Sequence, residues 1–310
     1  MDAPLIDVRS LHRGFGATQV LRGLDLQVGP GTVYGLVGRN GAGKTTLIRL
    51  LLGLLRPDSG AVSVAGRDPW RHEPSCHRAV GAVLEHDGFL GNLTFGQNMA
   101  FYADARGVGR AELAQYLREH WGGCELAGSP QKARYYSRGQ RMQGALCRAF
   151  LGWPRVCILD EPTVGLDIDS YDHFCALVRE ARSRGTAVVV SSHQLSAVEE
   201  LCDMVGLLEA GILRPVALRG QGRERWFVAV AEGGDEAVRT MVALAGGAVL
   251  EHDDGWRIEV ANPSQTIPAL VAALVGAGMR VREVRPDAPD LRQAIRGSAE
   301  RSAGTGDRTP

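Results

Sequence analysis

The sequence predicts an α/β fold with a mainly parallel sheet, and three features of the chain support this class. Short apolar runs at residues 33–37, 155–159 and 187–191 have the length and composition of buried strands. Each run ends in a loop or in polar side chains, as parallel strands do at a ligand site. Residues 45–55 have the spacing of a helix that follows the first of these strands. We therefore expect a ligand at the carboxyl edge of this sheet.

Further segments complete a first domain, which we place at residues 1–218. Residues 5–37 contain short strands broken by turns. A Pro-Asp-Ser-Gly turn at 57–60 precedes a strand at 61–65. The pattern becomes mostly helical between about residues 87 and 152, and we predict a helical subdomain there.

The pattern changes after about residue 219, and we predict a small α+β domain at residues 222–296. Its elements follow the order β-α-β-β-α-β, which is typical of a ferredoxin-like domain. The expected strands are 225–230, 248–251, 256–260 and 279–284, and the expected helices are 235–245 and 263–276. Residues 297–310 are rich in Gly, Ser and Thr, and we expect them to be disordered.

Composition limits the classes of function. The 310 residues carry a formal net charge of zero, so we expect no nucleic-acid partner. The first ten residues lack the basic flank and apolar core of a signal peptide. No apolar run approaches the ~20 residues that a membrane helix needs, so a role at a membrane would require a partner polypeptide. Six scattered cysteines favour free thiols in a reducing cytosol over disulfides or a metal site.

Residues 38–45 read Gly-Arg-Asn-Gly-Ala-Gly-Lys-Thr and fit the P-loop pattern at every position. Glycines let backbone N–H groups turn toward a phosphate, and the following helix presents its positive N-terminus to the same group. Lys44 adds a positive charge, and the Thr45 hydroxyl can bind Mg²⁺. The alternative is a glycine-rich turn before a helix, which the strand–loop–helix context disfavours. We expect nucleotide binding by Gly38, Asn40, Gly41, Gly43, Lys44, Thr45 and Thr46.

The strand at 155–159 ends in two carboxylates, Asp160 and Glu161. We expect Asp160 to hold Mg²⁺, usually through water, and Glu161 to orient and deprotonate an attacking water molecule. An acidic pair after a strand is weak evidence alone. Its position far downstream of a P-loop, with Pro-Thr-Val-Gly-Leu-Asp at 162–167, makes the interpretation strong.

Five motifs resemble those of ABC ATPases, and they occur along the chain in the order that this family shows. Residues 38–45 are similar to the Walker A motif, 160–163 to Walker B, 165–167 to the D-loop, and Ser-Ser-His at 191–193 to the H-loop. Tyr-Ser-Arg-Gly-Gln at 136–140 resembles the signature motif, which is usually Leu-Ser-Gly-Gly-Gln. The resemblance covers about residues 5–215. It implies an ABC-type P-loop NTPase with a helical subdomain, ATP as the nucleotide and Mg²⁺ as its metal.

The resemblance also implies a second copy of the chain. In this family two ATPase domains meet head to tail, and each ATP lies between the P-loop of one copy and the signature of the other. The resemblance places Asp167 at the dimer seam and implies that His193 contacts the γ-phosphate as a catalytic residue. It implies that Phe15 stacks on adenine, with a core phenylalanine as the alternative. The signature residues expected at the partner's nucleotide are Ser137, Gly139 and Gln140.

Two positions depart from the family pattern. Glu85 stands where a Gln is usual, and a carboxylate there can still bind Mg²⁺ or its bound water. It also adds negative charge beside the γ-phosphate, so we expect altered turnover or coupling. Arg138 replaces a signature glycine and adds a cation near the dimer seam, as relatives of the exporter type often do.

We expect an ATP-hydrolysing subunit at the cytoplasmic face of the membrane that powers export through a separate permease. Thr-Phe-Gly-Gln-Asn at 94–98, the charged signature and the small C-terminal domain are similar to drug and antibiotic-resistance exporter ATPases. Exposed apolar residues of 86–102 are expected to face the permease, with a core stripe as the alternative. The other functions considered are import, haem or lipid transport, and a soluble ABC ATPase acting on DNA or ribosomes. For the C-terminal domain we favour dimer support or regulation.

Overall fold

A computed structural model describes residues 3–71, 78–84, 88–192, 198, 200–216, 224–230, 238–239, 242–243, 247–252, 255–260 and 263–286. The chain divides into two compact units, residues 1–216 and 217–310, and each unit has a hydrophobic core of its own. The predicted boundary between residues 218 and 222 falls outside the described residues, and the predicted domain limits stay predictions.

The first unit is built on a six-stranded sheet, and its mainly parallel character confirms the predicted α/β class. Five neighbouring strands are parallel and the last, at one edge, is antiparallel. Every residue of the two strands β3 and β7 is buried, because both faces of a parallel sheet are covered. In spatial order the strands are β5 (Val80–Val83), β6 (Val156–Asp160), β7 (Ala187–Ser191), β3 (Val33–Val37), β8 (Met204–Glu209) and β9 (Ile212–Val216).

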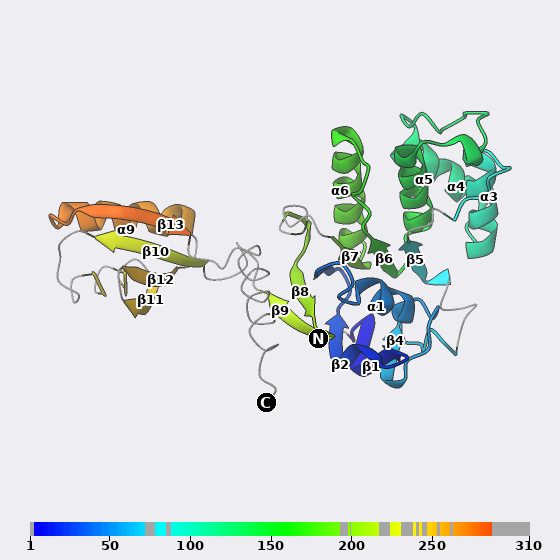
Figure 1. Ribbon diagram of the computed structural model, residues 1–310. Coiled ribbons are helices and arrows are strands. Elements are labelled where there is room, and N and C mark those ends of the chain that lie inside the picture. Colours follow the sequence, from blue (N-terminus) through cyan, green and yellow to red (C-terminus); the bar gives the residue numbers. More distant parts are fainter. Residues whose placement is uncertain are drawn as a thin grey trace. The chain divides into compact units, whose positions relative to one another are not determined.

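A second, three-stranded antiparallel sheet packs on the same core (Figure 1). Its order is β2 (Thr18–Val28), β1 (Ile6–Phe15) and β4 (Ser59–Val64). Helix α1 (Lys44–Leu51) contacts strands of both sheets and buries its apolar residues in their shared core. The helix is shorter than the predicted 45–55, because the chain turns at Gly53, which has a φ of 68°.

The described helices of the first unit that follow α1 are grouped together (Figure 1), and all but the last lie within residues 87–152, where the sequence predicted a helical region. They are α3 (Phe95–Arg106), α4 (Arg110–Trp121), α5 (Arg138–Phe150) and, after β6, α6 (Ile168–Ser183), with a short 3₁₀ turn at Ala133–Tyr135. Thr94 and Gln97 form a capping box at the start of α3. Gly107, in the left-handed conformation, ends the helix.

Two arginines connect these helices to strand β5 at the edge of the sheet. Arg106 donates to the carbonyls of Val80, Ala149 and Leu151 at 3.2, 3.2 and 2.8 Å. Arg148 donates to the carbonyl of Ala82 at 2.9 Å. An edge strand has carbonyls without a neighbouring strand, so these guanidinium groups provide hydrogen bonds that the sheet does not.

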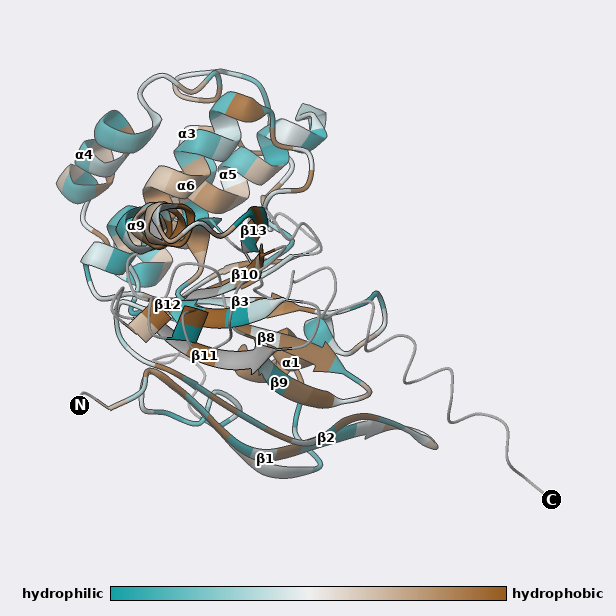
Figure 2. Cartoon of the chain, turned by 90° about the vertical axis from the view of Figure 1, so that its left-hand side faces the viewer, coloured by the Kyte–Doolittle hydropathy of each residue, from teal (hydrophilic) through white to brown (hydrophobic). Residues whose placement is uncertain are grey.

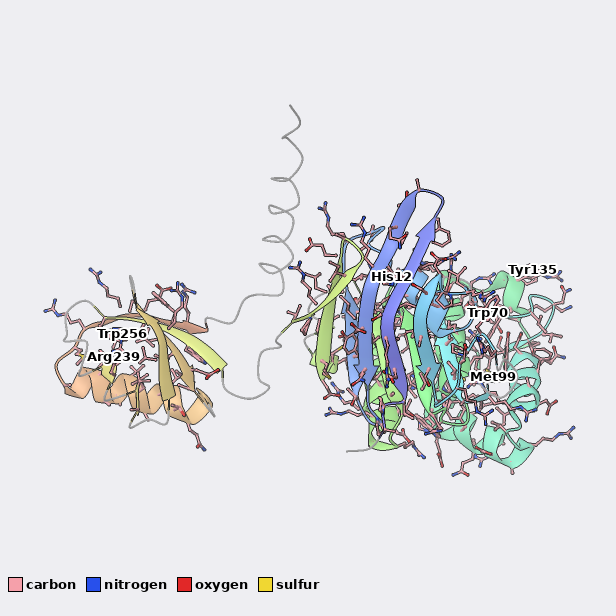
Figure 3. The ribbon with its side chains drawn as sticks, turned by 90° about the horizontal axis from the view of Figure 1, so that it is seen from below. His12, Trp70, Met99, Tyr135, Arg239 and Trp256 are labelled. Atoms are coloured by element: carbon pink, nitrogen blue, oxygen red, sulfur yellow. The ribbon has the colours of Figure 1, made fainter. Side chains whose placement is uncertain are left out.

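The second unit has a four-stranded antiparallel sheet in the order β11-β12-β10-β13. The strands are β10 (Glu224–Val230), β11 (Gly247–His252), β12 (Trp256–Val260) and β13 (Val281–Pro286), and the helix is α9 (Pro263–Gly276). Helix α9 is largely brown in Figure 2, where it is seen end-on, and its residues Ile267, Leu270 and Leu274 are in this unit's own core. Arg239 lies over the Trp256 ring at 5.5 Å (Figure 3).

This strand order and these directions agree with the ferredoxin-like arrangement expected from the sequence. The first expected helix, at 235–245, is described only at residues 238, 239, 242 and 243. The ferredoxin-like assignment therefore stays a prediction, as does the disorder expected for residues 297–310, which lie outside the described part of the chain.

Within the described residues, every helix is too short or too polar to span a membrane. The cysteines described are Cys124, Cys147, Cys157, Cys175 and Cys202, and all of them are free. Burial raises the pKa of the Cys157 thiol to about 12, so this group stays protonated at neutral pH.

Replacing Arg106 with Met should destabilise the first unit. The change leaves three carbonyls without their charged donor, and we expect a loss of about 2–4 kcal/mol in the free energy of unfolding. Urea denaturation followed by circular dichroism measures this loss. Arg110→Met, at the exposed first residue of α4, is the control, and equal stability of the two variants would contradict the structural role given to Arg106.

Candidate functional site

The loop between β3 and α1 has the local geometry that a phosphate cradle requires. Gly41 and Gly43 have φ values of 81° and 108°, which side chains rarely allow. A Cβ on Gly38 would lie 2.6 Å from the carbonyl oxygen of Leu208, so only glycine fits there. The loop leads directly into α1, whose first turn has no acidic residue. The positive helix N-terminus therefore remains available to an anion.

Lys44 places a positive charge inside this loop. Its side chain is buried, and its Nζ donates to the carbonyl of Gly38 at 2.7 Å. A buried ammonium group needs a partner, and here the loop itself provides the acceptors. The charge is thus fixed where the loop would bind a polyphosphate.

A hydrogen-bond chain joins the P-loop helix to the ends of β6 and β7. The Thr45 hydroxyl donates to Asp160 Oδ2 at 3.2 Å, and the Ser191 hydroxyl donates to Asp160 Oδ1 at 2.5 Å. Asp160 and Ser191 are register partners in the parallel ladder. The Thr45 hydroxyl and the Asp160 carboxylate are hard oxygen groups of the kind that Mg²⁺ prefers, so this edge of the sheet fits the expected metal.

Glu161 follows at a backbone position that is unusual for its residue type. Its φ is 50°, and its N–H donates to the Ser191 carbonyl at 3.2 Å and to the Ser191 hydroxyl at 2.9 Å. A left-handed conformation at a non-glycine residue costs about 1–3 kcal/mol and often occurs at functional sites. These bonds to Ser191 stabilise the turn that directs the chain out of the sheet at Glu161.

A cavity of about 800 Å³ brings these elements together. That volume is within the range of small-molecule sites. Phe15 lines the cavity and is 47% exposed, at the end of β1. The predicted residues that line it are Phe15, Asn40, Gly41, Gly43, Lys44, Thr45, Thr46, Asp160 and Glu161. The glycine-rich cradle, the buried Lys44 and the oxygen groups of Thr45 and Asp160 together fit a nucleotide with bound Mg²⁺.

The signature residues begin helix α5. Ser137 is its N-cap, and its hydroxyl accepts from Gln140 N while the Gln140 side chain accepts from Ser137 N. A Cβ on Gly139 would lie 3.3 Å from the carbonyl of Gly165, so the signature packs closely against the segment after Glu161. Ser137, Gly139 and Gln140 do not line the cavity of their own chain, whereas Arg138 does.

Asp167 caps helix α6. Its carboxylate accepts from Ser170 N at 2.8 Å, and hydrogen bonds from Ser170 lower the pKa of Asp167. The expected place of Asp167 at a dimer seam stays a prediction. Glu85 and His193 lie outside the described residues, so their expected roles also stay predictions.

Sequence reasoning assigned no role to two parts of the site. Ser191 was noticed only as part of the Ser-Ser-His run, yet it holds both Asp160 and Glu161. The α5 face that lines the cavity was also missed, and it includes Arg141, Met142 and Ala145. The helical spacing of these three residues was the available signal.

The fold and the site together define a P-loop nucleoside triphosphatase. The sequence profile of the ABC transporter family matches residues 21–164. The chain is 31% identical to the uncharacterized ABC transporter ATP-binding protein YdbJ of Bacillus subtilis (strain 168), over 92% of each chain. It is 30% identical to the daunorubicin resistance ATP-binding protein DrrA3 of Streptomyces coeruleorubidus, over 92% of this chain and 93% of that one. The chain belongs to the ATP-binding proteins of ABC transporters and is an ATPase.

Other similar proteins differ in what their names say of transport. The bacitracin transport ATP-binding protein BcrA of Bacillus licheniformis is 34% identical over 67% of this chain and 68% of its own. The methionine import ATP-binding protein MetN of Brucella abortus (strain 2308) is 30% identical over 68% of this chain and 59% of its own. A solved ATP-binding subunit of an ABC transporter has the same fold, with a TM-score of 0.66 at 24% identity over 86% of this chain and 99% of that one.

Replacing Lys44 with Ala should abolish ATP binding, because the buried charge in the phosphate cradle is lost. Isothermal titration of the purified chain with ATP measures this. Lys132→Ala, at an exposed position in the helical region, is the control. Retained ATP affinity in the Lys44 variant would contradict the assignment of the cradle.

Proposed function

We propose that this ATPase powers export through a separate membrane permease. The main support is the similarity to DrrA3, whose name refers to drug resistance and whose match extends through the C-terminal unit. The charged signature and the small C-terminal unit, both read from the sequence, agree with this assignment. The transported molecule would contact the permease, so its identity is not part of the proposal.

Within the proposed reaction the residues of the cavity have separate tasks. Lys44 and the glycine-rich loop bind and orient the phosphates. Thr45, Asp160 and, by the sequence argument, Glu85 would hold Mg²⁺, which neutralises charge that develops on the phosphate oxygens. Glu161 accepts a proton from the attacking water, and Phe15 stacks on the adenine. His193 is proposed to contact the γ-phosphate.

We propose that a second copy completes the site. Ser137 and Gly139 are absent from the cavity of their own chain, although they form the N-terminus of α5, where N–H groups favour an anion. A head-to-tail partner would direct this helix end at the nucleotide of the other copy. Asp167, the exposed N-cap of α6, is proposed to lie at the same seam.

The proposed permease-facing surface is limited to part of residues 86–102. Phe95 and Met99 are buried in the unit, which agrees with the core alternative for these two residues. Leu90 and Phe101 are 43% and 49% exposed. We assign only these exposed side chains to the permease contact.

Import is the second candidate, and the match to MetN is the observation that favours it. Co-purification of the tagged chain from membranes, followed by identification of bound subunits, separates the two directions. A permease without a substrate-binding protein supports export. Recovery of a substrate-binding protein with the complex would favour import and overturn the proposal.

Replacing Glu161 with Gln should slow ATP hydrolysis by roughly 10²-fold or more while ATP still binds, because a general base is removed and the phosphate contacts remain. Steady-state phosphate release and equilibrium ATP binding measure the two effects. Glu180→Gln, a carboxylate on α6 that does not line the cavity, is the control. An unchanged rate would refute the role given to Glu161.

Mixed dimers test whether the signature acts in trans. When one copy carries Lys44→Ala, the intact P-loop is in the other copy. Adding Ser137→Ala to the Lys44→Ala copy should then lower hydrolysis, because that copy supplies the signature. Adding Ser137→Ala to the other copy should have a smaller effect. Equal effects in the two arrangements would argue against the head-to-tail site.

Glu85→Gln restores the side chain that is usual in the family. We expect a change in hydrolysis rate or in its stimulation by the permease, because one negative charge is removed beside the proposed γ-phosphate position. Hydrolysis by the complex, with and without the permease, measures both. If both quantities stay the same, the Glu85 substitution is neutral.

A further inference from the structure

An arginine covers the aromatic ring at the edge of the nucleotide cavity. Arg13 and Phe15 are two residues apart on β1, so their side chains lie on the same face of the strand. The Arg13 guanidinium carbon lies 4.7 Å from the centre of the Phe15 ring, in a cation–π arrangement. The ring thus has one side covered by a cation, while its exposed part lines the cavity.

Asp58 holds this end of β1 from the turn before β4. Its carboxylate forms an ion pair with Arg13 at 2.6 Å and accepts from the N–H of Gly14 at 2.7 Å. The Asp58 N–H also donates to the carbonyl of His12 at 3.0 Å. One residue therefore contacts three consecutive residues of β1, of which His12 is labelled on its strand in Figure 3.

The backbone at the end of β1, which Asp58 contacts, is irregular. The pairing of β1 with β2 shifts register between Arg13 and Gly14. A Cβ on Gly14 would lie 2.6 Å from the side-chain oxygen of Gln19, so the hairpin is closely packed there. The N–H of Gly14 and then Arg13 lower the pKa of Asp58, which keeps the carboxylate ionised at neutral pH.

We infer that Arg13 and Asp58 are positioning residues for recognition of the nucleotide base. Asp58 fixes the guanidinium and the backbone of β1, and the guanidinium fixes the plane of the Phe15 ring. A purine base then packs on the side of the ring that faces the cavity, in the order Arg13, Phe15, base. This inference rests on the proposed role of Phe15 in adenine stacking.

The same strand offers a matched control pair. Arg9 and Asp7 also form an ion pair at 2.6 Å on β1, and neither lines the cavity. Neutralising Arg9 or Asp7 removes an ion pair from β1, as neutralising Arg13 or Asp58 does. It leaves Phe15 and its covering cation unchanged.

The test compares two ligands that share their phosphates. ATP and inorganic tripolyphosphate are titrated into the full chain and into Arg13→Gln, Asp58→Asn, Arg9→Gln and Asp7→Asn. We expect the Arg13 and Asp58 variants to bind ATP about two- to fivefold more weakly, the range of an exposed cation–π contact. Their tripolyphosphate affinity should stay the same, and the two control variants should match the parent chain with both ligands.

Three further measurements separate a positioning role from general damage to the fold. In a Phe15→Ala background, Arg13→Gln should cause no additional loss of ATP affinity, because it acts through the ring. Arg13→Lys, which keeps a cation, should recover part of the loss. The KM for ATP hydrolysis should rise in the Arg13→Gln variant while kcat is unchanged.

Equal weakening of ATP and tripolyphosphate would overturn the inference, because it would mean a distorted cradle. Unchanged ATP affinity in the Arg13 and Asp58 variants would also overturn it and leave the proposed export function intact. Unchanged affinity in Phe15→Ala would refute the stacking role and the inference with it. Failure of the proposed export function would be seen in a different experiment, as recovery of a substrate-binding protein with the purified complex.

Discussion

The hydrogen-bond chain from Thr45 through Asp160 to Ser191 is the interaction on which the rest of the site depends. It joins the first turn of α1 to the ends of two neighbouring parallel strands. Because Asp160 and Ser191 are register partners, the sheet itself fixes their separation. The phosphate cradle and Glu161, the proposed general base, therefore belong to one rigid edge of the sheet. The strain at Glu161 is tolerated there because Ser191 provides two acceptors for its N–H.

Helix starts explain much of the remaining arrangement. Helices α1, α5 and α6 begin after Gly43, Ser137 and Asp167, and each of these residues belongs to a segment that resembles a motif of ABC ATPases. A helix N-terminus has unpaired N–H groups and a partial positive charge. The same local chemistry that starts a helix therefore provides groups suited to phosphate. At the start of α5 and of α6 the N-cap side chain accepts a hydrogen bond from one of these N–H groups. Helix α1 begins after a glycine and has no side-chain cap.

Much of the fold was readable from the sequence because its signals are local. The runs at 33–37 and 187–191 are strands with those bounds, and 263–276 is a helix with the predicted limits. The helix predicted at 45–55 ends early, because apolar spacing continued past a residue whose backbone must turn. Propensity and periodicity describe neighbours along the chain, and they do not show where packing stops a helix.

The sequence by itself determined the P-loop, the acidic pair and the class of reaction, because each motif is a short segment whose spacing fixes its chemistry. Only the tertiary structure decided which residues support them. Ser191 reaches Asp160, and Asp58 reaches Arg13, across long stretches of chain. Such contacts depend on sheet register and on turns that bring distant segments together. No local pattern records that information, and so the supporting residues became visible only in the folded chain.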